Sequence, residues 1–105
     1  MDMNEVSKFE QRVGRLKLSE AIRIGAKMRP KQCRGQFFKD GASCALGAAY
    51  EAVHGRQPDT VSPDKASGML MDVYLYFEDA TGVFILNDTG HTREQIADLL
   101  EARGL

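Results

Sequence analysis

Apolar side chains recur every three or four residues in two successive segments near the start of the chain, as on one face of an amphipathic helix. Val6 and Phe9 belong to the first helix, which we expect over residues 4–15 as a peripheral element. A second helix begins near Ser19, a suitable N-cap residue, and ends before Pro30, because the residue preceding a proline avoids helical dihedrals. The two segments are also compatible with one bent helix. The second apolar stripe comprises Leu18, Ala21, Ile22, Gly25 and Met28.

Residues 31–43 change to a pattern typical of a β-hairpin. The aromatic pair Phe37-Phe38 precedes Asp40-Gly41. Both residues of an Asp-Gly dipeptide tolerate the positive φ angles of a tight hairpin turn. We therefore expect a strand of three or four residues on each side of this turn.

The most clearly marked helix of the sequence follows the hairpin. Ser43 is placed to cap its first turn, alanines favour its propagation, and Gly55 ends it. Its inner face carries small side chains, which allow a neighbouring backbone to approach closely. We expect this helix at the centre of the domain.

A fourth helix begins at Ser62, which can cap it, with Pro63 in the first helical position, where the missing N–H is harmless. Gly82 interrupts the helical pattern. The next four residues, 83–86, are all apolar, and so short a run is compatible with a strand beside Phe37-Phe38 or with one buried helical turn. The apolar face of the fourth helix comprises Ala66, Met69, Leu70, Val73, Tyr74 and Phe77.

The last helix begins at Thr92. Thr92 and Gln95 have the spacing of a capping box, in which each side chain bonds the backbone N–H of the other residue. Ile96, Leu99 and Leu100 form its inward stripe. Together these elements predict a single mainly α domain over residues 1–105, with four to five helices and a short β-hairpin or two-stranded element.

Composition agrees with one ordinary folded domain. The chain has 105 residues, of which 43% are hydrophobic and 28% charged, and its 14 basic and 15 acidic residues give a formal charge of −1. This balance creates no global field that would attract nucleic acid or an acidic membrane. The first residues lack the pattern of a signal peptide, and no apolar stretch reaches the ~20 residues needed to span a bilayer. We therefore expect a cytoplasmic protein with reduced thiols.

Cysteine and histidine side chains are the candidates for chemistry. Cys44 is expected at a helix N-terminus, where the helix dipole lowers the pKa of a thiol. With His91 or His54 as base it would form a small thiol-dependent hydrolase, in which Asp88 orients the base. The alternative is that Cys44 is a small buried residue between hairpin and helix. Because these residues lack zinc-ligand spacing, we expect no metal and no cofactor, and a disulfide from Cys33 to Cys44 is disfavoured in a reducing compartment.

The polar segment 87–90 precedes the last helix. It lacks the ligand pattern of a calcium loop and the glycines of a phosphate cradle, which favours an Asx-type turn. We expect Asn87 or Asp88 to bond Ser43 or exposed amides at the start of the central helix. Ser43, Asn87, Asp88 and Thr92 would then be structural turn and cap residues.

Basic residues gather around Pro30, interleaved with glutamines and two phenylalanines. Basic side chains beside aromatic faces are typical of phosphate and single-stranded nucleic-acid binding. The alternative is a solvated rim whose aliphatic stems cover apolar surface. This basic patch comprises Lys27, Arg29, Lys31, Arg34 and Lys39.

Two resemblances involve the second half of the chain. Residues 92–100 resemble the positioning helix of bacterial helix-turn-helix regulators, but too few residues follow for a recognition helix. The motif Cys44-Ala45-Leu46-Gly47-Ala48, combined with Asn87-Asp88 and Thr92, resembles a family of small, uncharacterised bacterial and phage-associated proteins over roughly residues 18–100. Many members of that family have tryptophan before Asn-Asp, where this chain has Leu86. The resemblance implies a small, mainly helical domain and no particular activity.

These patterns predict a non-enzymatic protein-interaction or accessory module, with a homodimer as one form of this role. The amphipathic segment with Val6 and Phe9 is the expected contact surface, because terminal amphipathic helices often dock onto partners. The alternatives are a thiol-dependent hydrolase using Cys44 and a nucleic-acid-binding accessory factor using the basic patch between Lys27 and Lys39.

Overall fold

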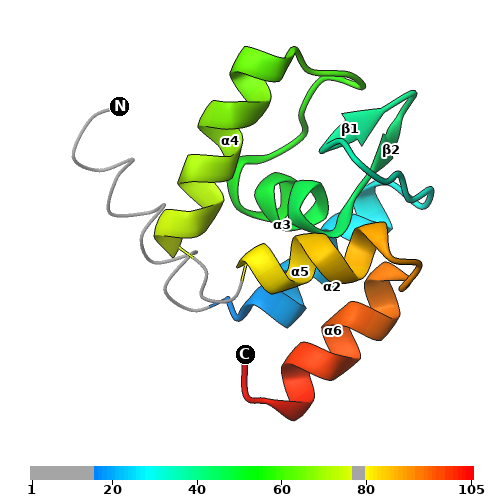
Figure 1. Ribbon diagram of the computed structural model, residues 1–105, viewed down its shortest axis with the longest axis vertical. Helices are drawn as coiled ribbons and strands as arrows, with labels where there is room; N and C mark the ends of the chain where they lie inside the picture. Colours follow the sequence, from blue (N-terminus) through cyan, green and yellow to red (C-terminus); the bar gives the residue numbers. More distant parts are fainter. Residues whose placement is uncertain (1–15, 77–79) are drawn as a thin grey trace.

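The computed structural model describes residues 16–76 and 80–105 and shows a mainly α domain in that part of the chain, as predicted (Figure 1). The helix expected over residues 4–15, with its contact surface at Val6 and Phe9, lies outside the described residues. No helix within the described ranges has the length and apolar character needed to cross a lipid bilayer. The elements are α2 (Leu18–Met28), β1 (Phe38–Lys39), β2 (Ala42–Ser43), α3 (Ala45–His54), α4 (Pro63–Tyr76), α5 (Ala80–Asp88) and α6 (Arg93–Ala102).

Helix α3 lies at the centre of the fold, as its small side chains predict (Figure 1). A Cβ atom added at Gly25 of α2 would lie 1.9 Å from the carbonyl oxygen of Ala48, so α2 and α3 meet backbone to backbone. A Cβ atom added at Gly47 would likewise lie 2.4 Å from the carbonyl oxygen of Phe37. The small residues of α2 and α3 therefore set how closely α3 and its neighbours approach.

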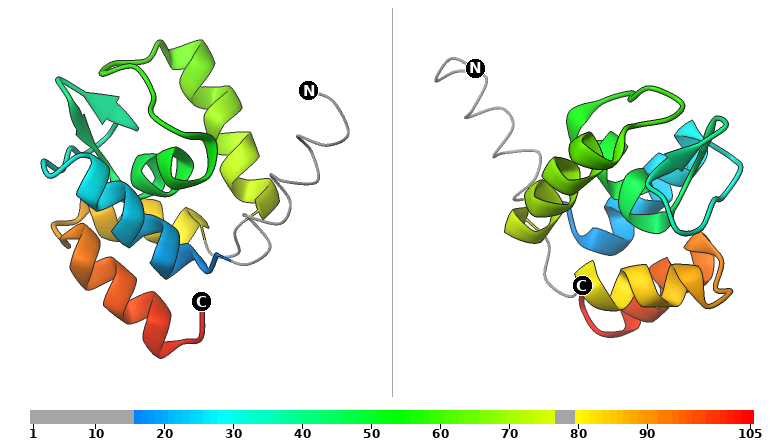
Figure 2. Two further views of the ribbon diagram at one scale, coloured as in Figure 1. Left: turned by 180° about the vertical axis from the view of Figure 1, so that it is seen from behind. Right: turned by 45° about the horizontal axis from the view of Figure 1, so that its top comes forward.

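Helix α2 also packs against α6, and Figure 2 shows the two side by side when the molecule is seen from behind. Ser19 does not cap α2, contrary to the sequence prediction. Lys17 occupies the N-cap position without a side-chain bond, and Ser19 is the second residue of the helix, where its hydroxyl donates to the backbone oxygen of Leu105 at 2.6 Å. The hydroxyl thus joins α2 to the segment that follows α6 instead of capping its own helix.

The hairpin turns at Asp40-Gly41, as predicted. Both residues have positive φ, 52° and 80°, which matches the right-handed twist of the flanking strands. The strands are shorter than expected, at two residues each, and Phe38 pairs with Ser43. Ser43 also forms a parallel bridge with Gln32 on its other side, so a third extended segment lies against β2.

Two of the four predicted helix caps occur at the expected residue. The Ser62 hydroxyl accepts from the N–H of Lys65 at 3.3 Å, and Thr92 forms the complete capping box with Gln95. Ser43 does not cap α3, because its hydroxyl is buried at the end of β2. Cys44 is the N-cap instead, and its sulfur accepts from the N–H of Gly47 at 3.3 Å.

Residues 83–86 are helical, so the alternative of a strand beside Phe37-Phe38 is wrong. Helix α5 begins at Ala80 and includes Gly82, and Val83 is its buried apolar contact with the core. On α4 the predicted stripe is confirmed at Met69 and Val73, which are buried, and at Ala66 and Leu70, which are partly buried. The remaining members of that stripe, Tyr74 and Phe77, are not among the side chains that the structure describes.

The inward stripe of α6 differs by one residue from the prediction. Ile96 and Leu100 are buried, but Leu99 is 47% exposed. Ala97 takes its place in the core, together with Arg93, whose side chain is buried at the first turn of the helix. Residues 93, 96, 97 and 100 form one face at helical spacing, and Leu99 lies outside it.

Candidate functional site

Cys44 does not have the environment of a nucleophile. The thiol is 1% exposed, and burial raises its pKa to about 12. The N–H of Gly47, which donates to the sulfur, lowers the pKa by less than burial raises it. The lowered pKa expected for a helix N-terminus is therefore wrong, because the cost of burying a charged thiolate exceeds the stabilisation that the N–H groups of the first turn provide.

The other members of the expected hydrolase site are engaged elsewhere. Asp88 accepts from the N–H of Gly35 at 2.9 Å, and the Nδ1 atom of His91 lies 3.2 Å from the carbonyl oxygen of Leu86. His54 stacks on Tyr50 at the far end of α3 from Cys44, about 15 Å away along the helix axis. Neither histidine bonds the thiol in these contacts. Among residues 16–76 and 80–105, no group of three or more His, Cys, Asp or Glu side chains is placed to hold a metal ion.

Asn87 is the most fully bonded side chain of the segment before α6. It does not form the expected Asx-type turn, since Asn87 and Asp88 are the last residues of α5. Its amide oxygen accepts from the N–H of Ala45 at 3.0 Å and from Gln32 at 2.8 Å. Its amide nitrogen donates to the carbonyl of Cys33 at 3.1 Å and to Asp88 at 3.1 Å. The expected contact with an exposed amide at the start of α3 is therefore present, through Asn87.

Arg93 is a buried structural residue that the sequence analysis did not identify. Its guanidinium donates to the carbonyl oxygens of Arg29 and Pro30 at 2.6 and 2.7 Å and to the hydroxyl of Ser43 at 2.9 Å. Burial lowers the pKa of this guanidinium. Its position in the sequence indicates this role, because Arg93 is the first residue of α6 and has helical spacing from the buried residues Ile96 and Leu100. It fastens the segment after α2 to the end of β2.

The basic patch loses Arg29, its central member, because that side chain is 0% exposed. Its guanidinium pairs with the equally buried carboxylate of Glu51 at 2.7 Å and with Asp59 at 2.8 Å, and it also donates to the carbonyl of Gln57. The hydrogen bond to Glu51 is the main cause that raises the pKa of Arg29. The guanidinium stacks over the ring of Phe38 at 4.8 Å. No phosphate can reach it without breaking this cluster.

Arg34 is exposed, but its Nε atom donates to the carbonyl oxygen of Asn87 at 3.1 Å and so holds the loop to the end of α5. Lys27, Lys31 and Lys39 are exposed on the surface. Without Arg29, the patch consists of separate surface cations, and no buried side chain among them fixes their arrangement. This arrangement fits the solvated rim better than a built phosphate site.

A hollow of about 500 Å³ lies at the N-terminus of α6 between Pro30 and Glu94. Helix N-termini bind anions through unpaired N–H groups. Here the N–H of Arg93 donates to Gln32 at 3.2 Å, and the N–H of Gln95 donates to Thr92 at 3.0 Å. The protein itself uses these donors, and the carboxylate of Glu94 offsets the charge of Lys27 on the lining, so the hollow is not built to hold an anion.

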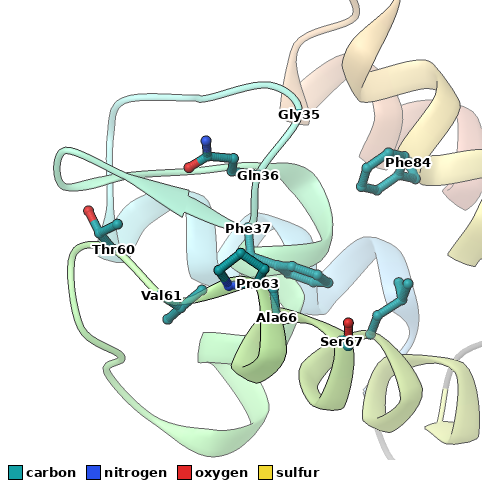
Figure 3. A pocket seen from close by; sticks show the side chains of 10 residues that line it. Gly35, Gln36, Phe37, Thr60, Val61, Pro63, Ala66, Ser67 and Phe84 are labelled. Atoms are coloured by element: carbon teal, nitrogen blue, oxygen red, sulfur yellow. The ribbon is translucent and has the colours of Figure 1, made fainter.

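A larger groove of about 520 Å³ opens between the loop before β1, the start of α4 and helix α5 (Figure 3). Phe37 lies at its centre, with Phe84 on one side and Val61 on the other. Phe37 belongs to the core, Pro63 is exposed, and the other large or aliphatic lining residues, Val61, Ala66, Leu70 and Phe84, are partly buried. We call this the apolar groove. It is lined by Gly35, Gln36, Phe37, Thr60, Val61, Pro63, Ala66, Ser67, Leu70 and Phe84.

The groove wall at residues 35–37 is held by polar contacts to α5. The N–H of Gly35 bonds Asp88, Arg34 bonds the backbone of Asn87, and Asn87 bonds the backbone of Cys33. Gly35 has a φ of 75°, a conformation that costs little energy only for glycine. The wall is therefore a fixed part of the fold. Comparisons with known protein families, with curated proteins and with solved structures find no match to this chain.

Proposed function

We propose that this chain is a non-catalytic protein-binding module whose apolar groove holds an uncharged apolar segment of a partner protein. The observation that carries the proposal is the chemistry of the lining. All ten lining residues are uncharged, and most are apolar. The volume of about 520 Å³ lies within the range of ligand-binding pockets, which is roughly 300–1,000 Å³.

The lining also favours a peptide over a small charged metabolite. A charged group placed in this groove would lose its hydration without gaining an opposite charge, which is costly. Gln36, Thr60 and Ser67 supply uncharged hydrogen-bonding groups at the rim, and these suit the backbone amides of a peptide. One or two large apolar side chains of the partner would fill the space beside Phe37 and Phe84.

The state of the reactive side chains supports binding over catalysis. Cys44 is buried with a raised pKa, and it does not line the groove. In the described residues, every buried side-chain nitrogen or oxygen has a hydrogen-bond partner. Polar groups here hold the fold together, and the groove contains no carboxylate, imidazole or thiol to move a proton or attack a substrate.

The exposed face of α6 argues against nucleic acid as the partner. Glu94, Asp98 and Glu101 lie along it and surround Arg23 of α2, with separations of 3.6, 2.7 and 3.1 Å. Three carboxylates against one guanidinium leave this face negative, which repels phosphate. The helix that resembles a positioning helix of DNA-binding regulators therefore has an unsuitable surface for that role.

We place this module in the cytoplasm, where Cys33 and Cys44, which are not bonded to each other, would stay reduced. A second copy of the chain is the alternative occupant of the groove, as in the homodimer expected from the sequence. Light scattering at two concentrations distinguishes these cases. A dimer of the wild-type chain that becomes monomeric on Ala66→Lys would make a second copy the occupant and would overturn the assignment to a different protein.

The direct test is selection of short random peptides on the folded chain. Peptides with neighbouring aromatic or aliphatic residues should be enriched, and they should fail to bind the variant Ala66→Lys, which places a charge in the groove. Met71→Lys is the matched control, because Met71 lies on the same helix, is 63% exposed and does not line the groove. Enrichment without an apolar motif, or equal loss of binding in both variants, would contradict the proposal.

A further inference from the structure

Cys33 and Cys44 are neighbours on two adjacent extended segments. The N–H of Ser43 donates to the carbonyl of Lys31, and the N–H of Cys33 donates to the carbonyl of Ser43, each at 3.1 Å. This is parallel pairing, with Gln32 opposite Ser43. The next residue on each segment is a cysteine, so the two Cα atoms are separated by about 5 Å, the spacing of adjacent strands.

The two cysteine side chains lie on the same face of this pair of segments. Gln32 and Ser43 both bond Arg93 and thus share one face. Successive side chains on extended backbone alternate, which places Cys33 and Cys44 together on the opposite face. The sulfur of Cys33 lies 3.8 Å from the carbonyl oxygen of Phe37, and that same oxygen accepts the N–H of Cys44 at 3.0 Å. A Cα separation of about 5 Å is within the range of disulfides, about 4.4–6.8 Å.

We propose that Cys33 and Cys44 form a reversible intramolecular disulfide when the folded chain meets a disulfide oxidant such as oxidised glutathione. Cys33 is the thiol that meets the oxidant, because it is partly exposed whereas Cys44 is 1% exposed. The reduced state in the cytoplasm and this oxidised state are compatible, since cytoplasmic disulfides form transiently under oxidation.

The chemistry proceeds by two thiol–disulfide exchanges. The thiolate of Cys33 attacks one sulfur of oxidised glutathione, breaks its S–S bond and releases one reduced glutathione, which takes up a proton. Cys44 then loses its proton and attacks the sulfur of Cys33, which releases the second glutathione. Two protein thiols are oxidised, and one oxidised glutathione becomes two reduced molecules. Burial raises the pKa of both thiols, so the exchange should take minutes to hours.

The new bond would close residues 33–44 into a loop. This loop contains the hairpin and the wall of the apolar groove from Gly35 to Phe37. Oxidation would therefore tie that wall to the first turn of α3 at a second point, in addition to the bond between Asn87 and Ala45. The inference rests on the two segments alone and holds whether or not the groove binds a peptide.

The test is intact-mass analysis of the full chain, folded and reduced, after incubation with oxidised glutathione at mildly alkaline pH. We expect a loss of about 2 Da that dithiothreitol reverses, and a proteolytic fragment joining Cys33 to Cys44. The variant Cys33→Ser should show no such loss. The variant Cys44→Ala should stop at a glutathione adduct on Cys33.

Three outcomes for the wild-type chain would overturn the proposal. These are a stable glutathione adduct as the end product, two free thiols after hours of incubation, and a disulfide-linked dimer. Because all three are measured on the wild-type chain, the test remains decisive even if a variant fails to fold. Circular dichroism recorded before and after oxidation should show the same helical spectrum, and a loss of helix would equally count against a bond between native neighbours.

Discussion

The amide oxygen of Asn87 accepts the N–H of Ala45 at 3.0 Å, while its amide nitrogen donates to the carbonyl of Cys33 at 3.1 Å. The two backbone groups are the ones that the next rung of the parallel pairing between residues 31–33 and β2 would join directly. Helix α3 begins at Ala45, so the two segments diverge after Cys33 and Cys44. The side-chain amide of Asn87 therefore takes the place of a peptide group and completes the ladder.

Replacing Asn87 by alanine should lower the free energy of unfolding by about 3 kcal/mol, because a buried N–H and a backbone carbonyl lose their partners. The melting temperature should fall by more than about 10 °C. Asp88→Ala is the matched control. Asp88 accepts from Gly35 and from Asn87 but is exposed, so water can replace it at both donors and its loss should cost only about 0.5–1 kcal/mol. Thermal melts that rank the two variants equally would contradict the role given to Asn87.

The local elements of this fold follow closely from its sequence. The Asp40-Gly41 turn, the proline-led start of α4 and the capping box of α6 each depend on residues within a few positions of one another, which is why a single sequence reveals them. The choice between a strand and a helix at residues 83–86 does not have this property. Four apolar residues fit either period, and only packing against α3 decides between them.

Gly25→Ala should destabilise the protein strongly. The added methyl group would lie 1.9 Å from the carbonyl oxygen of Ala48, so α2 and α3 would have to separate. We expect a loss of about 3 kcal/mol, at the upper end of overpacking costs. Gly68→Ala provides the control, since nothing lies within 4 Å of its added methyl group in α4. That variant should gain about 0.5–1 kcal/mol from helix propensity. Urea denaturation measures both, and a similar sign of change in the two variants would refute the close approach.

The long-range polar contacts are the part of the site that the sequence conceals. Arg29 belongs by position to a surface patch of cations, and nothing near it in sequence shows that its partner is Glu51. Arg93 likewise follows a cap and precedes an acidic residue, as exposed arginines often do. Their burial depends on contacts 22 to 64 residues apart, between Arg29 and Glu51 and between Arg93 and the backbone of Arg29.

Glu51→Gln tests the buried ion pair. The side chains of Glu51 and Arg29 are both 0% exposed, and Glu51 also accepts the N–H of Gln57 at 2.8 Å. The variant removes the buried counter-charge of Arg29 and leaves only the exposed carboxylate of Asp59 beside it, and we expect a loss of about 3–5 kcal/mol. Asp59→Asn removes the other carboxylate on Arg29, but that side chain is 67% exposed and should cost less than about 1 kcal/mol. Denaturation midpoints should therefore shift far more for Glu51→Gln, and comparable shifts would show that the pair is not isolated from water.

Alkylation by iodoacetamide should distinguish the two thiols in the native protein at neutral pH. Cys33 is partly exposed and should react, whereas Cys44 should react only when the fold opens. In the variant Cys33→Ser, labelling of the native chain should be at least ~100-fold slower than labelling in urea. Rapid modification of Cys44 without denaturant would restore the thiol-dependent hydrolase as a candidate.

The raised pKa of Cys44 also predicts how stability depends on pH. Folding favours the protonated thiol, because burial holds the pKa of Cys44 at about 12 while an exposed thiol titrates near 9. The contribution of Cys44 to the free energy of unfolding is therefore fully present below about pH 9 and is lost as the pH rises toward 12. In that window the unfolded chain releases the proton first, so the free energy of unfolding should fall by about 1 kcal/mol per pH unit from this group alone.

Lysine and tyrosine side chains add their own pH dependence, which the variant Cys44→Ala retains. Urea denaturation of both proteins between pH 8 and about 10.5 should show the steeper decline in the wild-type chain, and parallel curves would mean that water reaches the thiol.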